Sequence, residues 1–515
     1  MLSGSEGERV SKRLLVKIGA VAAGLALAAP ALSGCAPETG DRDSGESAAQ
    51  RQAFPAVYEQ TIAWQACDSS LGYRDDFEEF LTGVGARVDG VRCALVEVPF
   101  DWGDPENTDT IQLSTMHIPA TGDDPIGTLL SNPGGPGASG IEFALGLTAA
   151  ESFAAVHEHY DLLGFDPRGI ARSAPLQCES ESTILELQLA LCAEQDPLAS
   201  SMGTAQVARD MELLRHLMGD ETMHYAGFSY GTVIGASYAT LFPERTGRLL
   251  LDSAWPSDWS SALGSYEQYA ARSEALIELL AQCGVDYAVA VCPLGGEASL
   301  MQTQEALDAQ PLSATDGSHL DGRMLYGYLT SALYQLPTGR QRALDLTGRA
   351  LEGEQQAIDE ITAAMASGGM GVDLSGMVVR CLSSPRDANL MGLVNFIETN
   401  GLPRLLGGPE ITDDTLRQFV DLKCEALPDS GEDFMMFSNA SDAPILVIGL
   451  TGDHATPYAG AGQLVEELGN ARLLTLDGSG HIATFTGRSS CADAAAIAYL
   501  IDGVLPPEGT VCTDD

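Results

Sequence analysis

Basic side chains are scarce in this sequence of 515 residues. Lysine and arginine together number 27, against 72 aspartates and glutamates, so the formal net charge is −45. Nucleic acid is bound by clustered lysine and arginine, so this balance excludes a nucleic-acid partner. We expect the acidity to form a solvated, self-repelling surface. The other interpretation is that some acidic side chains meet a cationic group on a substrate.

Metal and phosphate patterns are also missing. The sequence has no Cys-x-x-Cys and no His-x-x-x-His, so its cysteine and histidine spacings do not fit zinc, and no metal is predicted. The glycine-rich run of residues 132–140 lacks the Gly-Lys-Ser/Thr ending of a phosphate-binding Walker loop. No cofactor is therefore expected.

The first 34 residues have the pattern of an export signal. Four basic residues open it: Arg9, Lys12, Arg13 and Lys17. The apolar stretch of residues 18–31 is too short to span a bilayer. Small residues then precede Cys35, and this ending resembles a bacterial lipobox. The resemblance implies export, cleavage before Cys35, and lipidation of Cys35 as an anchor at the outer face of the cell membrane. An ordinary secretory signal with an incidental cysteine is the alternative. Residues 35–55 are rich in small and polar side chains and predict a flexible tether.

The cysteines support an exported protein. Eleven are present, and setting aside Cys35 leaves an even number, ten, which suggests disulfides. Local spacing offers five pairs, although the sequence alone does not prove them: Cys67 with Cys93, Cys178 with Cys192, Cys283 with Cys292, Cys381 with Cys424, and Cys491 with Cys512.

Short apolar strands alternate with helices over much of the chain. The strands are expected at residues 91–100, 111–118, 128–131, 160–166, 248–252, 444–450 and 471–476, with another just before Ser229. Such alternation predicts an α/β fold with a mostly parallel central sheet. The rhythm breaks between residues 257 and 442, where mainly helical segments predict an insertion over the carboxyl ends of the strands. We call residues 257–442 the cap. The core domain then comprises residues 56–256 and 443–515.

The chain is organised around Gly227-Phe-Ser-Tyr-Gly231, which we call the elbow. A strand precedes it and a helix follows it, as a nucleophile elbow requires. Glycines two residues either side of Ser229 leave room for a strained turn that lifts the serine hydroxyl clear of the sheet. The helix N-terminus beside it favours negative charge. Ser229 is therefore the predicted nucleophile.

A serine hydroxyl needs a base within hydrogen-bond reach, and the base needs an orienting acid. Asp453 and His481 each follow one of the two strands that resume after the cap, in the order acid then histidine. Histidine can accept the serine proton and return it to the leaving group. His454, next to the acid, cannot easily turn onto the same serine and is disfavoured. Asp453 and His481 are therefore the predicted acid and base.

Asp166 and Arg168 lie in a turn after the strand at residues 160–166. They are expected to brace this turn beside the active site through a charge-assisted hydrogen bond. A catalytic role for either residue is the alternative.

Four motifs occur in order along the chain. They are Gly134-Gly-Pro-Gly-Ala-Ser-Gly140, Gly164-Phe-Asp-Pro-Arg-Gly169, Gly227-Phe-Ser-Tyr-Gly-Thr232, and the closing stretch from Ser490 to Cys512. From about residue 64 to the C-terminus, the sequence resembles the secreted tripeptidyl aminopeptidases of the prolyl-aminopeptidase-like group of α/β-hydrolases. The resemblance implies an α/β-hydrolase fold with a TAP-like C-terminal region and a triad of Ser229, Asp453 and His481.

The hydrolase fold also predicts an oxyanion hole. It combines the N–H of the residue after the nucleophile, here Tyr230, with an N–H from the loop after the third strand, here Gly135. The family resemblance implies a serine exopeptidase that removes short peptides, often tripeptides, from peptide substrates with a free N-terminus. The cap would block longer occupancy.

The chain departs from the family pattern at two positions. Ala171 replaces a second glycine, and Ser383 stands two residues after a cap cysteine, where the family commonly has aspartate. The second departure bears on substrate preference, because acidic cap residues are the natural partners of a substrate ammonium group. Three cap glutamates are available for that role, although a solvated helix face is the alternative for each: Glu267, Glu274 and Glu278.

Three functions are compatible with the sequence. The first is a lipid-anchored serine aminopeptidase. The second is an esterase or amidase with the same triad, since the fold does not choose the acyl substrate. The third is a catalytically idle binding lipoprotein, against which the intact triad residues and oxyanion glycines count.

Overall fold

The computed structural model describes residues 45–74, 76–83, 90–178, 180, 182, 184–289, 291–367, 373–385, 390–420 and 422–515. The predicted signal segment and Cys35 lie outside these residues. Within them, no helix combines the length and apolar character needed to cross a bilayer.

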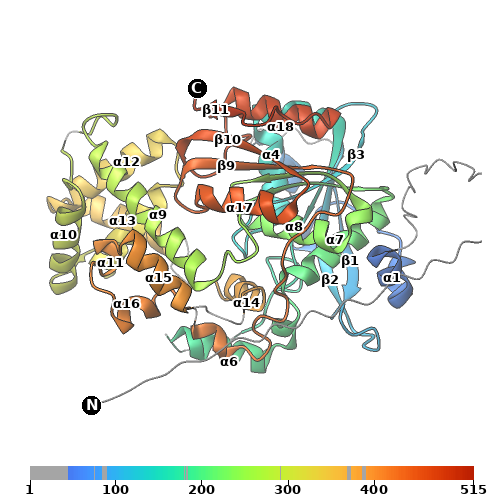
Figure 1. The fold of residues 1–515 in the computed structure, drawn as a ribbon, viewed down its shortest axis with the longest axis horizontal. Helices are drawn as coiled ribbons and strands as arrows, with labels where there is room; N and C mark the ends of the chain where they lie inside the picture. The colour runs from blue at the N-terminus through green and yellow to red at the C-terminus, as the bar shows by residue number, and fades with distance from the viewer. Residues whose placement is uncertain are drawn as a thin grey trace, which may run out of the picture. The chain divides into compact units, whose positions relative to one another are not determined.

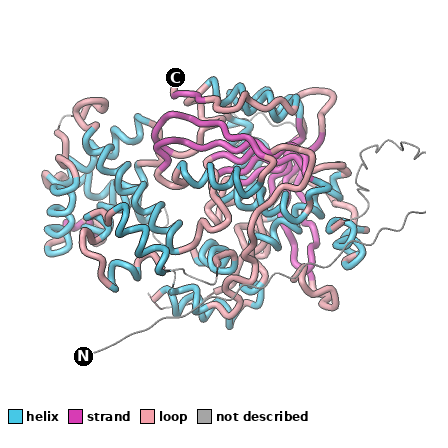
Figure 2. The backbone as a smooth tube through the Cα atoms, viewed as in Figure 1, coloured by secondary structure: helices cyan, strands magenta, loops and turns pink. Residues whose placement is uncertain are grey.

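A nine-stranded sheet forms the centre of the fold, in the order β1-β2-β4-β3-β5-β6-β9-β10-β11 (Figures 1 and 2). Its strands are β1 (Arg92–Pro99), β2 (Thr110–Ile118), β3 (Gly127–Asn132), β4 (Tyr160–Phe165), β5 (Met223–Phe228), β6 (Thr246–Asp252), β9 (Ile445–Asp453), β10 (Ala471–Gly480) and β11 (Val511–Thr513). Only the pairings that involve β2 are antiparallel. The predicted mostly parallel α/β sheet is confirmed, and the carboxyl ends of its parallel strands share one edge.

Helices cover both faces of the sheet. One face packs against α7 (Thr204–Met218), α8 (Tyr230–Leu241) and α17 (Tyr458–Leu468). The other packs against α4 (Gly140–Ala149), α5 (Ala154–His159) and α18 (Ser490–Asp502). Successive side chains of β6 point to opposite faces of the sheet. Leu249 and Leu251 pack in the first core, and Leu250 packs in the second. Burial on both faces explains why these strands are almost continuously apolar.

The insertion after β6 is mainly helical. Its helices are α9 (Ala262–Ala281), α10 (Glu297–Ala309), α11 (Gly322–Ala332), α12 (Pro337–Leu351), α13 (Gln355–Ser367), α14 (Leu374–Leu382), α15 (Leu390–Asn400) and α16 (Asp413–Arg417), with a small hairpin of β7 (Leu312–Ser313) and β8 (His319–Leu320). Helices α9 to α13 share a hydrophobic core of their own. By contrast, α14 packs into the core of the sheet through Val378, Val379 and Leu382. Part of the predicted cap is thus built onto the hydrolase core.

The segment predicted as a flexible tether differs from expectation. Within residues 35–55, α1 (Glu46–Ala53) is a helix, and α2 (Pro55–Tyr58) follows directly. Ser47 is buried, and its Oγ donates to Glu212 at 2.5 Å. Glu46 accepts from Arg209 at 2.5 Å. The polar composition that suggested a linker instead supplies contacts to α7, so the tether prediction is wrong from residue 46 onward.

Five disulfides join the cysteines of the described chain. They are Cys67–Cys93, Cys178–Cys192, Cys283–Cys292, Cys381–Cys424 and Cys491–Cys512. These are the five pairs that local spacing offers. The Cys381–Cys424 bridge closes the longest loop, with a separation of 43 residues, and ties α14 to the end of the insertion. Cross-linking of this kind lowers the entropy of the unfolded chain.

Candidate active site

Ser229 occupies the tight turn between β5 and α8. Its φ of 54° lies in the left-handed region, which a non-glycine residue rarely adopts. Both flanking glycines are sterically required. A Cβ at Gly227 would meet Gly231 O, and a Cβ at Gly231 would lie 2.5 Å from Asn132 O. The strained serine and the close backbone approaches are those that a nucleophile elbow needs.

Asp453 and His481 form a buried pair at the ends of β9 and β10. His481 Nδ1 lies 2.9 Å from Asp453 Oδ1 and 3.0 Å from Oδ2. The Asp453 side chain is fully buried, and that of His481 is 9% exposed. An acid that binds Nδ1 fixes the ring and leaves Nε2 for the serine. The structure thus gives Asp453 and His481 the geometry of the predicted acid and base.

Asp453 is held as a carboxylate by a set of donors. Its Oδ1 accepts from the N–H groups of Ala455 and Thr456, both at 2.9 Å, and its Oδ2 accepts from Thr456 Oγ1 at 2.9 Å. Burial acts to raise the pKa of Asp453, but the attraction and hydrogen bond of His481 and the backbone N–H groups outweigh burial. The pKa of Asp453 is therefore lowered, which keeps it ionised beside the histidine.

The elbow and the histidine meet at the end of β6. Ser229 N donates to Asp252 O at 3.0 Å, and Ile482 N donates to Ser253 Oγ at 2.8 Å. Among the described residues, no hydrogen bond joins the Ser229 hydroxyl to His481. Catalytic hydrogen bonds often tighten only when substrate binds. The end of β6 therefore supports both the elbow and the loop that carries His481, without a Ser229–His481 hydrogen bond.

The oxyanion loop, residues 132–140, lies against the elbow through Gly134. A Cβ at Gly134 would lie 2.8 Å from Tyr230 N and 2.9 Å from Ser229 Cβ. Gly134 N already donates to Asn132 Oδ1 at 2.8 Å. Among the described residues, the N–H groups of Gly135 and Tyr230 donate to no other backbone group. Both predicted donors thus remain available for an oxyanion, and their role stays a prediction.

The cap reaches the elbow through a chain of hydroxyl groups. Tyr230 Oη lies 2.6 Å from Thr204 Oγ1, which lies 2.7 Å from Ser383 Oγ. All three residues are buried. Ser383 stands where the family commonly has aspartate, and here it helps to fix the ring of Tyr230, which follows Ser229. This contact could not be predicted from the sequence, because Thr204 and Ser383 are 179 residues apart.

We expect Gly134→Ala to lower kcat by about 10²-fold, the effect typical of losing one oxyanion donor. The new Cβ would lie 2.6 Å from Phe228 O, and the φ of 100° at this position is strained for alanine. The loop must therefore move away from the elbow. Turnover of a serine-hydrolase substrate measures the effect. Gly146→Ala, at a glycine of α4 with open space around it, is the matched control. An unchanged kcat in Gly134→Ala would contradict the expectation.

Asp166 and Arg168 brace the fold through separate partners. Arg168 is fully buried and forms a bidentate pair with Asp210 of α7, at 2.8 Å and 2.6 Å. Asp166 Oδ1 accepts from Ser139 Oγ at 2.5 Å, at the start of α4. Asp166 thus supports the base of the oxyanion loop, whereas Arg168 anchors the turn to α7. Neither residue takes part in the Asp453–His481 pair.

The ring of His454 lies beside that of His481, the predicted base. Its ring centroid is 6.0 Å from that of His481 and 4.4 Å from that of Tyr334. It is 1% exposed, and among the described residues neither ring nitrogen has a hydrogen-bond partner. Burial lowers the pKa of His454 to about 4. His454 is therefore uncharged near neutral pH. Its ring packs beside those of His481 and the cap residue Tyr334.

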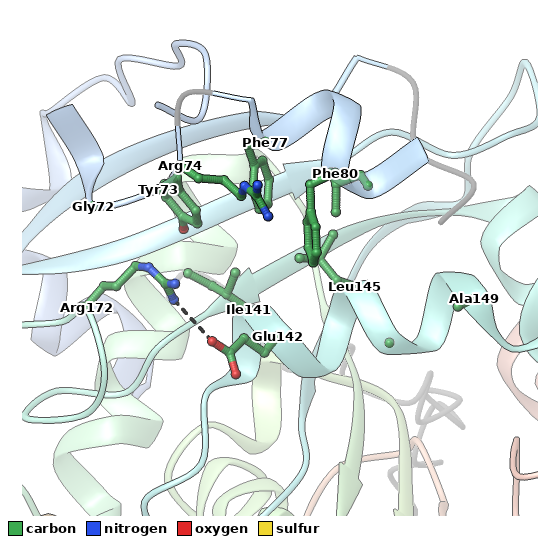
Figure 3. Close-up of a pocket in the computed structure, with 12 residues that line it drawn as sticks. Gly72, Tyr73, Arg74, Phe77, Phe80, Ile141, Glu142, Leu145, Ala149 and Arg172 are labelled. Atoms are coloured by element: carbon green, nitrogen blue, oxygen red, sulfur yellow. Dashed lines mark ion pairs between the residues drawn. The ribbon is translucent and has the colours of Figure 1, made fainter. Parts of the chain in front are cut away.

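Two cavities are lined by neither Asp453 nor His481. One of about 520 Å³ lies between α3 (Phe77–Gly83) and α4, with apolar side chains and the Arg172–Glu142 ion pair around it (Figure 3). Another of about 480 Å³ is lined by Glu267 and Glu274 of α9. Burial raises the pKa of Glu267. No predicted catalytic residue lines either cavity. Among the described residues, no cluster of side chains could hold a metal ion.

Comparison with known proteins gives a consistent assignment. Residues 127–272 match the alpha/beta hydrolase fold family, and residues 410–512 match the TAP-like protein family. Serine protease Hip1 of Mycobacterium tuberculosis is 28% identical over 98% of this chain and 100% of its own length. Carboxylesterase B of the same species is 29% identical over 97% of both chains. A tripeptidyl aminopeptidase of Streptomyces lividans is 32% identical over 32% of this chain and 35% of its own.

The chain has the α/β-hydrolase fold with a TAP-like C-terminal region. The two matched regions cover the elbow, on one side of the cap, and the Asp453–His481 pair, on the other. With the strained serine between β5 and α8, this makes the protein a serine hydrolase.

Proposed function

We propose that the protein is an exported, lipid-anchored serine aminopeptidase that releases short peptides, chiefly tripeptides, from free N-termini. The proposed triad is supported by the buried Asp453–His481 pair, which is joined to the elbow of Ser229 through the end of β6. The peptidase part is supported by the names of two relatives, a serine protease and a tripeptidyl aminopeptidase. The anchor is supported by the lipobox-like ending at Cys35.

The proposed reaction is acyl transfer to Ser229. His481 Nε2 takes the proton as Ser229 Oγ attacks the scissile carbonyl, and Asp453 stabilises the imidazolium that forms. The N–H groups of Gly135 and Tyr230 stabilise the oxyanion. His481 then protonates the leaving amine. A water molecule, deprotonated by His481, hydrolyses the acyl-enzyme and releases the short peptide.

The cap borders the site on two sides. Tyr334, which follows α11, places its ring 5.7 Å from that of His481. On the oxyanion side, the carboxylate of Asp373 occupies the space where a side chain at Gly137 would be. Cap elements over both the base and the oxyanion loop favour a substrate that enters by its end. The Asp373 carboxylate is a suitable partner for the substrate ammonium there.

A tripeptide with a chromogenic amide, offered with free and acetylated N-termini, tests the proposal. We expect cleavage of the free form only, because acetylation removes the ammonium that the cap carboxylate pairs with and also adds bulk at the end of the substrate that the cap borders. Equal cleavage of both forms would contradict an aminopeptidase. The relative named carboxylesterase B favours one second candidate, an esterase on the same triad. Cleavage of simple esters with no peptide cleavage would support it.

We expect Asp373→Asn to raise KM for the free tripeptide amide about two- to fivefold, as for an exposed ion pair. The carboxylate is exposed and also accepts from Gly376 N at 3.0 Å, which asparagine can retain. Steady-state kinetics measure the effect. Asp316→Asn, an exposed carboxylate in a cap turn, makes the same charge change elsewhere. If Glu267→Gln raises KM and Asp373→Asn does not, the ammonium site lies at Glu267.

The anchor has its own test. Mass spectrometry of the N-terminal peptide of the membrane-extracted protein should find a lipid on Cys35. A mature N-terminus at another residue, with Cys35 absent or unmodified, would show an ordinary secretory signal.

A further inference from the structure

Asp252, the last residue of β6, contacts both the elbow and the loop that carries His481. Its carbonyl oxygen accepts from Ser229 N at 3.0 Å. Its carboxylate accepts from Ala483 N at 3.1 Å, from Thr484 N at 2.8 Å and from Thr484 Oγ1 at 2.6 Å. These last donors belong to residues 481–485, which we call the histidine loop. Asp252 thus joins the elbow to a loop whose residue Thr484 lies 232 positions after Asp252 in the chain.

The sheet order explains why such a support is needed. Ser229 follows β5, whereas His481 follows β10, and β6 and β9 lie between them. Asp453 fixes the orientation of the His481 ring but does not fix how far the histidine loop lies from the elbow. Ser253 adds to the same support, because its Oγ accepts from Ile482 N. Positive φ values occur at three residues here: Ser229, Ser253 and Ile482. Such a backbone conformation is strained and persists only when the surrounding contacts hold it.

We propose that Asp252 is a positioning residue that holds the histidine loop at the correct distance from the nucleophile. The carboxylate is completely buried, and within the described part of the chain every donor to it comes from the histidine loop. It does not reach the His481 ring by a hydrogen bond, so it acts through the backbone that carries His481. Asp453 orients the ring, and Asp252 sets the place of the loop.

The test is Asp252→Asn. An amide keeps one acceptor but turns a donor toward the N–H and O–H groups of the histidine loop, which must shift. The backbone carbonyl that holds Ser229 is unchanged. A misplacement of about 1 Å can cost about 10²-fold, so we expect kcat to fall about 10- to 100-fold with KM within about twofold. The rate at which a fluorophosphonate labels Ser229 should fall in parallel.

Asp220→Asn is the matched control. Asp220 is a half-buried carboxylate that accepts from Thr128 N, at the edge of the sheet opposite the elbow. It should lose stability without losing kcat or labelling rate. If Asp252→Asn changes only the melting temperature and leaves kcat and labelling as in wild type, the inference is overturned.

Thr484 supplies a second pair of variants in case Asp252→Asn does not fold. Thr484→Val removes the donor at 2.6 Å and should lower kcat, whereas Thr484→Ser keeps the hydroxyl and should retain it. Equal kcat in both variants would also overturn the inference.

The inference rests on the proposed roles of Ser229 and His481. Fluorophosphonate labelling separates the two failures, because it requires no peptide substrate. If wild type is not labelled, or Ser229→Ala is labelled equally, the proposed function fails and the inference with it. If wild type is labelled and Asp252→Asn is labelled at the same rate, only the inference fails.

Discussion

Replacing Ser229 with alanine should abolish hydrolysis while leaving the protein folded. The nucleophile and its base act as a unit, so loss of the serine hydroxyl removes about 10⁴-fold or more of kcat. Turnover of the free tripeptide amide measures this loss. Any residual rate reports what binding and the oxyanion donors contribute without a nucleophile.

The stability of Ser229→Ala separates chemistry from folding. Among the described residues, the Ser229 hydroxyl makes no hydrogen bond, whereas its backbone N–H and C=O bond Asp252 and Thr232. Alanine retains both backbone contacts. We therefore expect the free energy of unfolding to change by less than about 1 kcal/mol. Chemical denaturation checks this, and retained turnover would remove Ser229 as the nucleophile.

Local patterns predicted those parts of the fold that depend on neighbouring residues. The apolar runs of β3, β4, β6 and β9 are strands that are buried on both faces. The elbow was visible for the same reason. Its glycines, serine and flanking elements occupy a short stretch, and steric contacts within that stretch explain them.

Long-range partners could not be predicted from such patterns. A strand-end aspartate such as Asp252 carries no mark of the backbone N–H groups that it binds more than 200 residues away. The partner of Arg168 proved to be Asp210, on α7. The polar residues of α1 suggested a tether. They are instead held by Arg209 and Glu212, which lie far away in the sequence. Each miss concerns a polar side chain whose environment is set by tertiary packing.

Asp453→Asn should reduce kcat by about 10⁴-fold, through the tautomer of His481. Asp453 Oδ1 accepts from two backbone N–H groups, so the amide oxygen of asparagine will take that place. The NH₂ group then faces His481 Nδ1 and stabilises the tautomer that carries its proton on Nε2. That tautomer cannot accept the Ser229 proton. KM should change little, since Asp453 is buried behind the histidine.

The same variant tests the electrostatics of the pair through the pH dependence of stability. The pKa of Asp453 is lowered in the folded protein, so its ionised form contributes stability above the unfolded pKa of about 4. This contribution is lost as the pH falls through the lowered folded value. The difference in unfolding free energy between wild type and Asp453→Asn should therefore be largest near neutral pH and shrink below about pH 4. A difference that is constant down to acid pH would mean that His481 and its neighbours do not hold Asp453 as a carboxylate. The kcat loss would then need a cause other than the charge of Asp453.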